Sequence, residues 1–140
     1  MSYALIHLKN AWQVDQAILN EQSRLVVIRW GLEDTIECKL QDQILFQIAE
    51  KCKNFVAIYA VEIDKVTDFN QMYQLDSPST LMFFFRNQHI QVDTGTGNNN
   101  TLNFLLDDKQ ELIDLFEVIY RGVVKGKDLI ISTTKFGEHR

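Results

Sequence analysis

The residues with the clearest bearing on chemistry are Thr35 and Cys38, which begin and end the stretch Thr35-Ile36-Glu37-Cys38. This stretch follows an apolar run and opens a helical pattern, where a dithiol oxidoreductase carries Cys-x-x-Cys. In such an enzyme the first thiolate attacks a disulfide and the second resolves the intermediate. Because a threonine hydroxyl does not perform thiol–disulfide exchange, the pattern excludes dithiol catalysis. Thr35 and Cys38 are therefore interpreted as a vestigial redox position.

Cys38 on its own leaves two interpretations open. The acidic side chains of Glu33, Asp34 and Glu37 surround it in sequence, and nearby negative charge disfavours the reactive thiolate. We favour a buried thiol that lines a helix, which is the usual state of a free cysteine. The alternative is a monothiol redox protein that uses Cys38. Cys52 falls on an apolar helical stripe and is expected in the core.

Other catalytic and metal-binding patterns are absent from the sequence. His7, His89 and His139 have no metal-ligand spacing, and two cysteines are too few for a zinc cluster or a disulfide scaffold. No Gly-x-Ser-x-Gly, His-Glu-x-x-His or Walker-type motif occurs. We therefore expect no cofactor, no metal site and no enzymatic activity.

The run Gly95-Thr96-Gly97-Asn98-Asn99-Asn100 is unusual because its residues tolerate left-handed backbone conformations. It lacks the lysine of a phosphate-binding loop. Ordering such a run costs much conformational entropy, which indicates a specific loop shape presented to a partner. The candidate partner-binding residues of this loop are Gly95, Gly97, Asn98, Asn99 and Asn100.

Charge is distributed unevenly along the chain. Residues 1–120 carry 9 basic and 17 acidic side chains, whereas residues 121–140 carry 5 basic and 2 acidic ones. An acidic body repels nucleic-acid phosphates, so we expect RNA contact to be indirect or minor and confined to the C-terminal segment. The candidate basic contacts are Arg121, Lys125 and Lys127, together with Arg86.

The composition is that of an ordinary globular protein, with 46% hydrophobic and 24% charged residues among 140. No apolar stretch is long enough to span a bilayer, and the N-terminus lacks the pattern of a secretory signal. We therefore expect a soluble protein of a reducing compartment, cytosol or nucleus, with no membrane partner.

The first part of the chain predicts a helix and a buried strand. Asn10 is suited to cap a helix through about residue 19, whose apolar contacts are Trp12, Ile18 and Leu19. Residues 25–30 form a β-branched apolar run without alternation, which is typical of a strand covered on both faces. Gly31 is expected to end this strand.

A second helix and strand complete a β-α-β unit. Asp34 and Glu37 match a capping box, and one apolar stripe follows it, formed by Leu40, Ile44, Leu45, Ile48, Ala49 and Cys52. Residues 55–61 form another continuous apolar strand. A strand, a crossover helix and a buried strand predict a parallel pair. A short helix is expected around residues 68–73.

The remainder predicts an antiparallel hairpin and a closing helix. Residues 81–85 and 88–93 are separated by two residues, Arg86-Asn87, which is hairpin spacing. Three successive phenylalanines before this turn must alternate between the faces of the sheet, so we favour core positions over an exposed anchor. Asp107 or Asp108 is expected to cap the last helix and Gly122 to end it. Residues 129–131 are a candidate packing segment.

This order, with an extra helix in front, is the arrangement of the thioredoxin fold: an α/β protein with a central mixed sheet flanked by helices. The single proline, Pro78, precedes the third predicted strand and is a candidate cis-proline there. We expect one thioredoxin-like domain over residues 1–124 and a C-terminal extension, or tail, over residues 125–140.

Several stretches closely resemble one family throughout the chain. They are Trp12-Gln13-Val14-Asp15-Gln16-Ala17-Ile18, Val26-Val27-Ile28-Arg29, Ile48-Ala49-Glu50-Lys51, Met82-Phe83-Phe84-Phe85-Arg86-Asn87, His89, the Gly95–Asn100 loop, Asp108-Lys109-Gln110-Glu111 and Tyr120-Arg121-Gly122. The family is the DIM family, the small thioredoxin-like proteins (15-kDa, thioredoxin-like protein 4 type) of the spliceosomal U5 small nuclear ribonucleoprotein (snRNP).

The resemblance implies a nuclear protein required for pre-mRNA splicing, present in the U5 snRNP and the U4/U6.U5 tri-snRNP before spliceosome activation. It implies protein partners in these particles, including the large U5 scaffold protein. Our preferred hypothesis is therefore a non-catalytic docking subunit, monomeric outside the complex. The alternative is the monothiol redox protein, and the third and weakest hypothesis is a direct RNA-binding protein.

Overall fold

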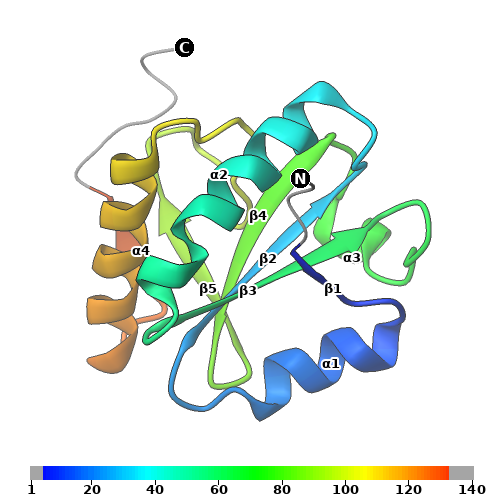
Figure 1. The fold of residues 1–140 in the computed structure, drawn as a ribbon. Coiled ribbons are helices and arrows are strands. Elements are labelled where there is room, and N and C mark those ends of the chain that lie inside the picture. Colours follow the sequence, from blue (N-terminus) through cyan, green and yellow to red (C-terminus); the bar gives the residue numbers. More distant parts are fainter. Residues whose placement is uncertain (1–4, 133–140) are drawn as a thin grey trace.

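A six-stranded mixed sheet forms the centre of the protein, and helices cover both of its faces (Figure 1). The computed structural model of the chain describes residues 5–132. The strands are β1 (Ile6–His7), β2 (Leu25–Gly31), β3 (Val56–Glu62), β4 (Ser79–Phe85), β5 (Gln88–Asp93) and β6 (Leu129–Ile131). The helices are α1 (Ala11–Asn20), α2 (Ile36–Cys52), α3 (Asn70–Tyr73) and α4 (Lys109–Val124).

The sheet order β1-β3-β2-β4-β5-β6 follows from the predicted β-α-β unit and hairpin. Strands β2 and β3 are parallel, joined by the α2 crossover, whereas β4 runs antiparallel to β2 on its other side. Every residue of β2 is buried, because strands lie on both sides of it and helices on both faces. The predicted mixed sheet flanked by helices is confirmed.

The three phenylalanines of β4 divide the core into two halves. Phe83 and Phe85 face α2 and α4, whereas Phe84 lies in the cluster that contains α1 and the α3 region. All three rings are buried. The alternation predicted from the strand period is therefore confirmed, and none of these rings is an exposed anchor.

The β4–β5 hairpin turns at the two predicted residues. Arg86 and Asn87 have φ angles of 49° and 64°. Positive φ at both central positions defines a type I′ turn, whose twist matches that of the flanking strands. Asn tolerates this region through its short polar side chain, whereas Arg86 is held there by its contacts, described below.

The helix starts and the N-terminal strand differ in part from the sequence analysis. Asn10 caps α1 as predicted, but Trp12 is 69% exposed and Leu19 is also exposed, so only Ile18 of the three expected contacts is buried. Thr35, rather than Asp34, caps α2. Strand β1 was missed, because two residues carry no periodic signal.

The C-terminal part of the fold corrects two expectations. Helix α4 is capped by Asp108 but continues through Gly122 to Val124. It ends in a Schellman motif, in which the amides of Gly126 and Lys127 bond to the carbonyls of Val123 and Gly122 and Gly126 has a φ of 90°. Gly122 serves packing instead, since a Cβ there would overlap the side chain of Ile130.

Strand β6 pairs in parallel with β5, so residues 129–131 extend the sheet. Part of the segment expected to be a tail from residue 125 therefore belongs to the domain, and its packing role is confirmed. Residues 133–140 of that segment lie outside the described residues. No helix among residues 5–132 has the length and apolar character needed to cross a membrane.

Candidate functional site

Thr35 and Cys38, which the sequence analysis interprets as a vestigial redox position, lie in a closed, structural corner of the molecule. The Thr35 hydroxyl donates to the carbonyl of Leu32 at 2.7 Å and accepts from the amide of Cys38 at 3.3 Å. The Cys38 side chain is 0% exposed. The Thr35 hydroxyl is thus occupied in capping α2.

The Cys38 thiol is held in its neutral form. Burial raises its pKa to about 12, and the carboxylates of Asp42, Glu62 and Glu33 add to this against the lowering effect of Arg29. A thiol needs to ionise to attack a disulfide. Cys52 is also buried, and its pKa is raised by burial. Fourteen residues of helix separate the two sulfurs by roughly 21 Å, so they do not form a pair.

A buried ion-pair network lies under Cys38. Arg29, at 0% exposure on β2, forms two 2.7 Å hydrogen bonds to the carboxylate of Asp42 on α2. A third bond, of 2.9 Å, joins Arg29 Nη1 to Glu62 Oε2 at the end of β3. A bidentate guanidinium–carboxylate pair fixes both position and angle. The network ties α2 to the strands beneath it.

Pro78 closes the corner from the opposite side. Its carbonyl accepts from the amide of Leu32 at 2.9 Å. A Cβ placed on Gly31 would lie 2.5 Å from the Pro78 carbonyl oxygen and 2.8 Å from Cys38 Sγ, so only glycine fits between them. The candidate cis-proline is wrong: no peptide bond within residues 5–132 is cis. The trans bond is the common state of X–Pro and suffices for this approach to β4.

The polar loop at residues 94–100 is held in one shape by its own side chains. Asn98 Oδ1 accepts from the amides of Asn100 and Thr101 at 3.1 and 3.3 Å, and Asn98 Nδ2 donates to Thr101 Oγ1 at 2.8 Å. Gly95 and Gly97 have φ angles of 90° and 88°. Asn98 therefore organises the loop, a role that the sequence did not reveal.

The end of the loop packs back against β5 and extends the sheet. The backbone carbonyl oxygen of Asn100 is 3.0 Å from His89 Nε2. The side-chain Oδ1 of Asn100 accepts from Gln91 Nε2 at 2.9 Å. Leu102 then pairs with Leu81 through two backbone hydrogen bonds, beyond the reach of β5. The loop is therefore part of the framework.

The side chain of Gln41 fastens the segment after the polar loop to α2. The buried amide of Gln41 donates to the carbonyl of Leu106 at 3.2 Å and accepts from the amide of Leu106 at 2.9 Å. A glutamine side chain satisfies both backbone groups of one residue in this way. Helix α2, which begins after Thr35, and the segment after the loop are thus held together.

A cavity of about 390 Å³ opens between the loop and α3. Its lining is mainly polar and includes Asn98, Asn100 and Asn103 on one side and Met72, Gln74 and Asp76 on the other. The Met72 side chain is 64% exposed. This hollow combines fixed amide groups with a flexible apolar side chain, which suits protein recognition. The sequence analysis missed Met72, because a four-residue helix gives no apolar stripe.

The predicted partner-binding residues fall in three separate places. Asn98 and Asn100 line the cavity, whereas Asn99 turns its carbonyl to the amide of Val92. Arg86 lies over the ring of Phe85 and donates to the carbonyl of Gln22 at 3.0 Å, so it supports the hairpin turn. The remaining basic residues form a third group.

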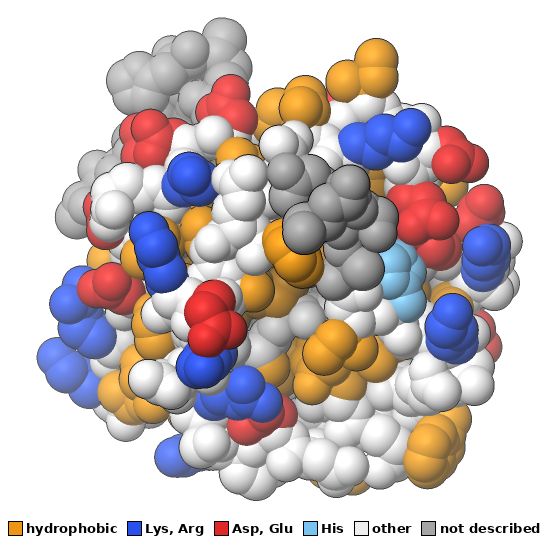
Figure 2. Space-filling model, viewed as in Figure 1, with side chains coloured by type: hydrophobic (Ala, Val, Ile, Leu, Met, Phe, Trp, Pro, Cys, Tyr) orange, Lys and Arg blue, Asp and Glu red, His pale blue; other side chains and the backbone are white. Residues whose placement is uncertain are grey.

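Arg121, Lys125 and Lys127 line one surface depression together with β6. In Figure 2 basic side chains gather on the side of the molecule where Figure 1 shows α4. The hydrophobic side chains of Leu129 and Ile131 are exposed beside them. Three of the four predicted basic contacts therefore lie together in one depression, which shares no lining residue with the cavity beside the polar loop.

The profile of the family described as "Mitosis protein DIM1" matches residues 4–136. The chain is 55% identical to "Mitosis protein dim1" of Schizosaccharomyces pombe, over 100% of this chain and 99% of that protein. It is 49% identical to "Spliceosomal protein DIB1" of Saccharomyces cerevisiae, over 99% and 97%. It is 33% identical to human "Thioredoxin-like protein 4B", over 94% and 89%.

Solved structures of thioredoxins share the fold. Fasciola hepatica thioredoxin superposes with a TM-score of 0.65 at 13% identity, covering 81% of this chain and 97% of that one. Oxidised mitochondrial thioredoxin 3 of Saccharomyces cerevisiae gives 0.64 at 14% identity, covering 84% and 98%. At these identities the likeness shows the thioredoxin-like fold alone.

Proposed function

The chain belongs to the DIM1 family, and on this premise we propose that it is a non-catalytic docking subunit of the spliceosome. The proposed location is the nucleus, and the proposed particles are the U5 snRNP and the U4/U6.U5 tri-snRNP before activation. Relatives of nearly the same length are named as spliceosomal proteins. The carrying observation is the closed corner at Cys38, which keeps the fold of a redox protein without an accessible thiolate.

The docking surface in this proposal is the cavity between the polar loop and α3. Asn98 already holds the loop in one shape. Binding of a partner segment in the cavity therefore costs little conformational entropy in this loop. Exposed amides at Asn100 and Asn103 offer donors and acceptors, and Met72 offers an adaptable apolar contact. A polar peptide segment of a U5 protein, such as the large scaffold protein, fits this chemistry.

The basic group on α4 and β6 is proposed as a secondary contact. Three cations beside an exposed apolar strand edge suit an acidic protein segment better than naked RNA, because the rest of the chain is acidic. Replacement of Arg121, Lys125 and Lys127 by glutamine should weaken particle entry modestly and more strongly at low salt. Tight binding of the purified chain to naked RNA with a steep salt dependence would instead favour the RNA-binding alternative.

The central test is capture from nuclear extract. The tagged full chain should recover U5 proteins together with U4, U5 and U6 RNAs, and recovery of none of these would defeat the proposal. Met72→Asp should reduce recovery at least tenfold, because it places a charge at the cavity rim. Leu40→Asp, an exposed position on α2 outside the cavity, is the matched control and should retain recovery. If both variants lose recovery of U5 components, the cavity is not the docking site.

Within residues 5–132, the surroundings of Cys38 do not favour the monothiol redox alternative. A reactive lone thiol sits in an accessible, electropositive environment. Cys38 is 0% exposed, and Arg29, which lowers the pKa of its thiol, is already bound by Asp42 and Glu62. Size-exclusion chromatography should show the isolated chain as a monomer.

A further inference from the structure

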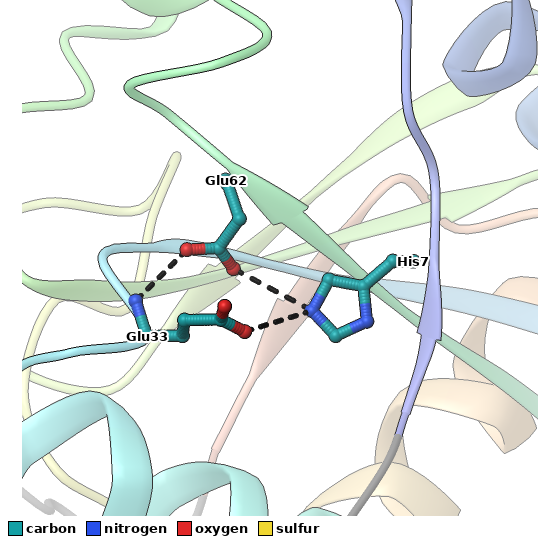
Figure 3. Close-up of side chains that lie close together, drawn as sticks. All are labelled: His7, Glu33 and Glu62. Carbon is teal, nitrogen blue, oxygen red and sulfur yellow. Dashed lines mark hydrogen bonds and ion pairs between the residues drawn. The ribbon is translucent and has the colours of Figure 1, made fainter.

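Three side chains meet at the carboxyl ends of three neighbouring parallel strands (Figure 3). His7 ends β1, Glu62 ends β3, and Glu33 lies two residues beyond the end of β2. One ligand atom of each lies within 4.8 Å of the others. Figure 2 shows a histidine against a group of acidic side chains on the viewed face. Sequence spacing gave no sign of this cluster, because its members come from three separate strands.

The proton arrangement of His7 leaves one nitrogen facing negative charge. His7 Nδ1 is 2.9 Å from the carbonyl oxygen of Leu5, which only accepts, so Nδ1 carries a hydrogen. In the neutral ring, Nε2 then presents a lone pair to Glu33 Oε2 at 3.3 Å and to Glu62 Oε2 at 3.6 Å. The Nε2 atom is buried and makes no hydrogen bond. The repulsion at this point is relieved either by a proton on Nε2 or by a cation that the three groups share.

The distances indicate which positive charge fits. A charge-assisted hydrogen bond from an imidazolium to a carboxylate spans about 2.7–2.9 Å, which is shorter than both separations here. Zinc bonds nitrogen and carboxylate oxygen at about 2.0–2.2 Å, and tetrahedral geometry then sets neighbouring ligand atoms roughly 3.4 Å apart. The two separations from His7, 3.3 and 3.6 Å, agree with shared coordination of a metal ion, and all three ligand atoms lie within 4.8 Å of one another.

The surroundings hold the carboxylate of Glu62 in place and leave the cluster with a net negative charge. Glu62 is 7% exposed, its Oε1 accepts from the amide of Glu33 at 2.8 Å, and its Oε2 accepts from Arg29 Nη1 at 2.9 Å. A carboxylate oxygen has a second lone pair left for a metal. Because Asp42 balances Arg29, the two glutamates leave a net charge of about −2 with neutral His7, which one divalent cation cancels.

We propose that His7, Glu33 and Glu62 form a zinc-binding site with three protein ligands and one position left for water. The site opens to a hollow of about 300 Å³, whose rim also carries the exposed side chains of Lys9 and Lys65. Bound zinc joins the two-residue strand β1 to the ends of β2 and β3. The water position distinguishes it from a closed structural zinc site, and its effect on the fold is to fasten the N-terminal strand that leads into α1.

The test uses the full chain, stripped of metal by a chelator and kept reduced. Equilibrium dialysis against zinc chloride at pH 7.5 should give one zinc per chain, and zinc should raise the melting temperature. Cobalt in place of zinc should give visible d–d absorption without the near-ultraviolet band of a thiolate ligand. This spectrum separates the proposed site from binding at Cys38 or Cys52.

Matched variants locate the metal. Glu33→Gln and His7→Gln should each weaken zinc binding at least tenfold, whereas Asp34→Asn, which removes the neighbouring exposed carboxylate, should bind as the unaltered chain does. Glu33 is 49% exposed in its side chain, so its variant should fold normally by circular dichroism even if His7→Gln does not. No stoichiometric zinc in the unaltered chain, or undiminished zinc in Glu33→Gln, would overturn the proposal in favour of a protonated His7.

Discussion

The corner around Cys38 and the cavity beside the polar loop show opposite uses of one framework. At Cys38, polar and charged groups are buried and bonded to one another: Thr35 caps a helix, and Arg29 is held by two carboxylates. At the cavity, Asn98 is bonded within the loop while its neighbours remain open to solvent. The first region is inaccessible to substrates, and the second is rigid but accessible. The proposed recognition surface therefore lies away from the closed corner at Cys38.

Loss of Arg29 should produce the largest effect on this contrast. Arg29→Met leaves Asp42 and Glu62 buried without their shared cation, and breaking one side of a buried pair costs about 3–5 kcal/mol in the free energy of unfolding. Urea denaturation at pH 7.5 measures this loss. Arg86→Met, at an exposed turn, is the control and should cost under about 1 kcal/mol.

The pH dependence of this variant has a definite sign. Burial raises the pKa of Asp42 even with Arg29 lowering it, and removal of Arg29 leaves only the smaller lowering effect of His7 against burial. A carboxyl whose pKa is raised on folding binds its proton more tightly when folded, so its contribution favours stability as pH falls toward its unfolded pKa. The deficit of Arg29→Met should therefore shrink between pH 8 and pH 5. An unchanged deficit would show that Asp42 stays ionised.

Gly31→Ala should open the closed corner without removing a charge. The added methyl group conflicts with the Pro78 carbonyl and with Cys38 Sγ, and overpacking of this kind costs about 1–3 kcal/mol. The Cys38 thiol should then react faster with a soluble disulfide reagent than in the unaltered chain. If stability falls while the thiol remains unreactive, the corner relaxes without opening.

Asn98→Ala should loosen the loop and so test the other region. It removes three hydrogen bonds that the side chain makes within the loop, at a cost of about 1–2 kcal/mol, and it should reduce recovery of U5 components. Asn99→Ala is the matched control, since only the backbone of Asn99 is used in the loop, and it should leave stability nearly unchanged. Equal effects of the two changes would contradict the organising role of Asn98.

Replacement of Cys38 should have the smallest effect on recovery of U5 components. With its pKa at about 12, the thiolate fraction at pH 8 is about a thousandfold below that of an ordinary thiol, and higher nucleophilicity recovers only about 20- to 30-fold. Native Cys38 should therefore react at least about 30-fold more slowly than the unfolded chain. Cys38→Ala should cost about 1 kcal/mol and leave particle recovery intact. Disulfide turnover by the purified chain would refute the docking proposal.

Much of the fold followed from the sequence because its signals are local. The two-residue hairpin turn, the helix caps at Asn10 and Asp108 and the continuous apolar run of β2 each depend on neighbours in the chain. Gly122 was misplaced for the opposite reason, since its glycine is required by contact with Ile130 across the fold. A glycine near a helix end is read as a stop unless that contact is known.

The site was harder to predict than the fold. Arg29 lies within a run that reads as entirely apolar core, and its partner carboxylates come from positions 13 and 33 residues further along. The His7–Glu33–Glu62 cluster likewise exists only after three strands align. Even the loop was interpreted correctly only as a shape, because which asparagine holds it and which lines the cavity depends on side-chain direction.

The Gln41 clamp makes the two contrasted regions mechanically dependent. Its amide serves Leu106 as a neighbouring strand would, so the Leu106 amide should rank among the slowly exchanging hydrogens although it lies in an irregular segment. A partner bound at the cavity would then slow exchange along α2 as well. Under the docking proposal, α2 would couple the binding of a partner at the cavity to the packing around Cys38.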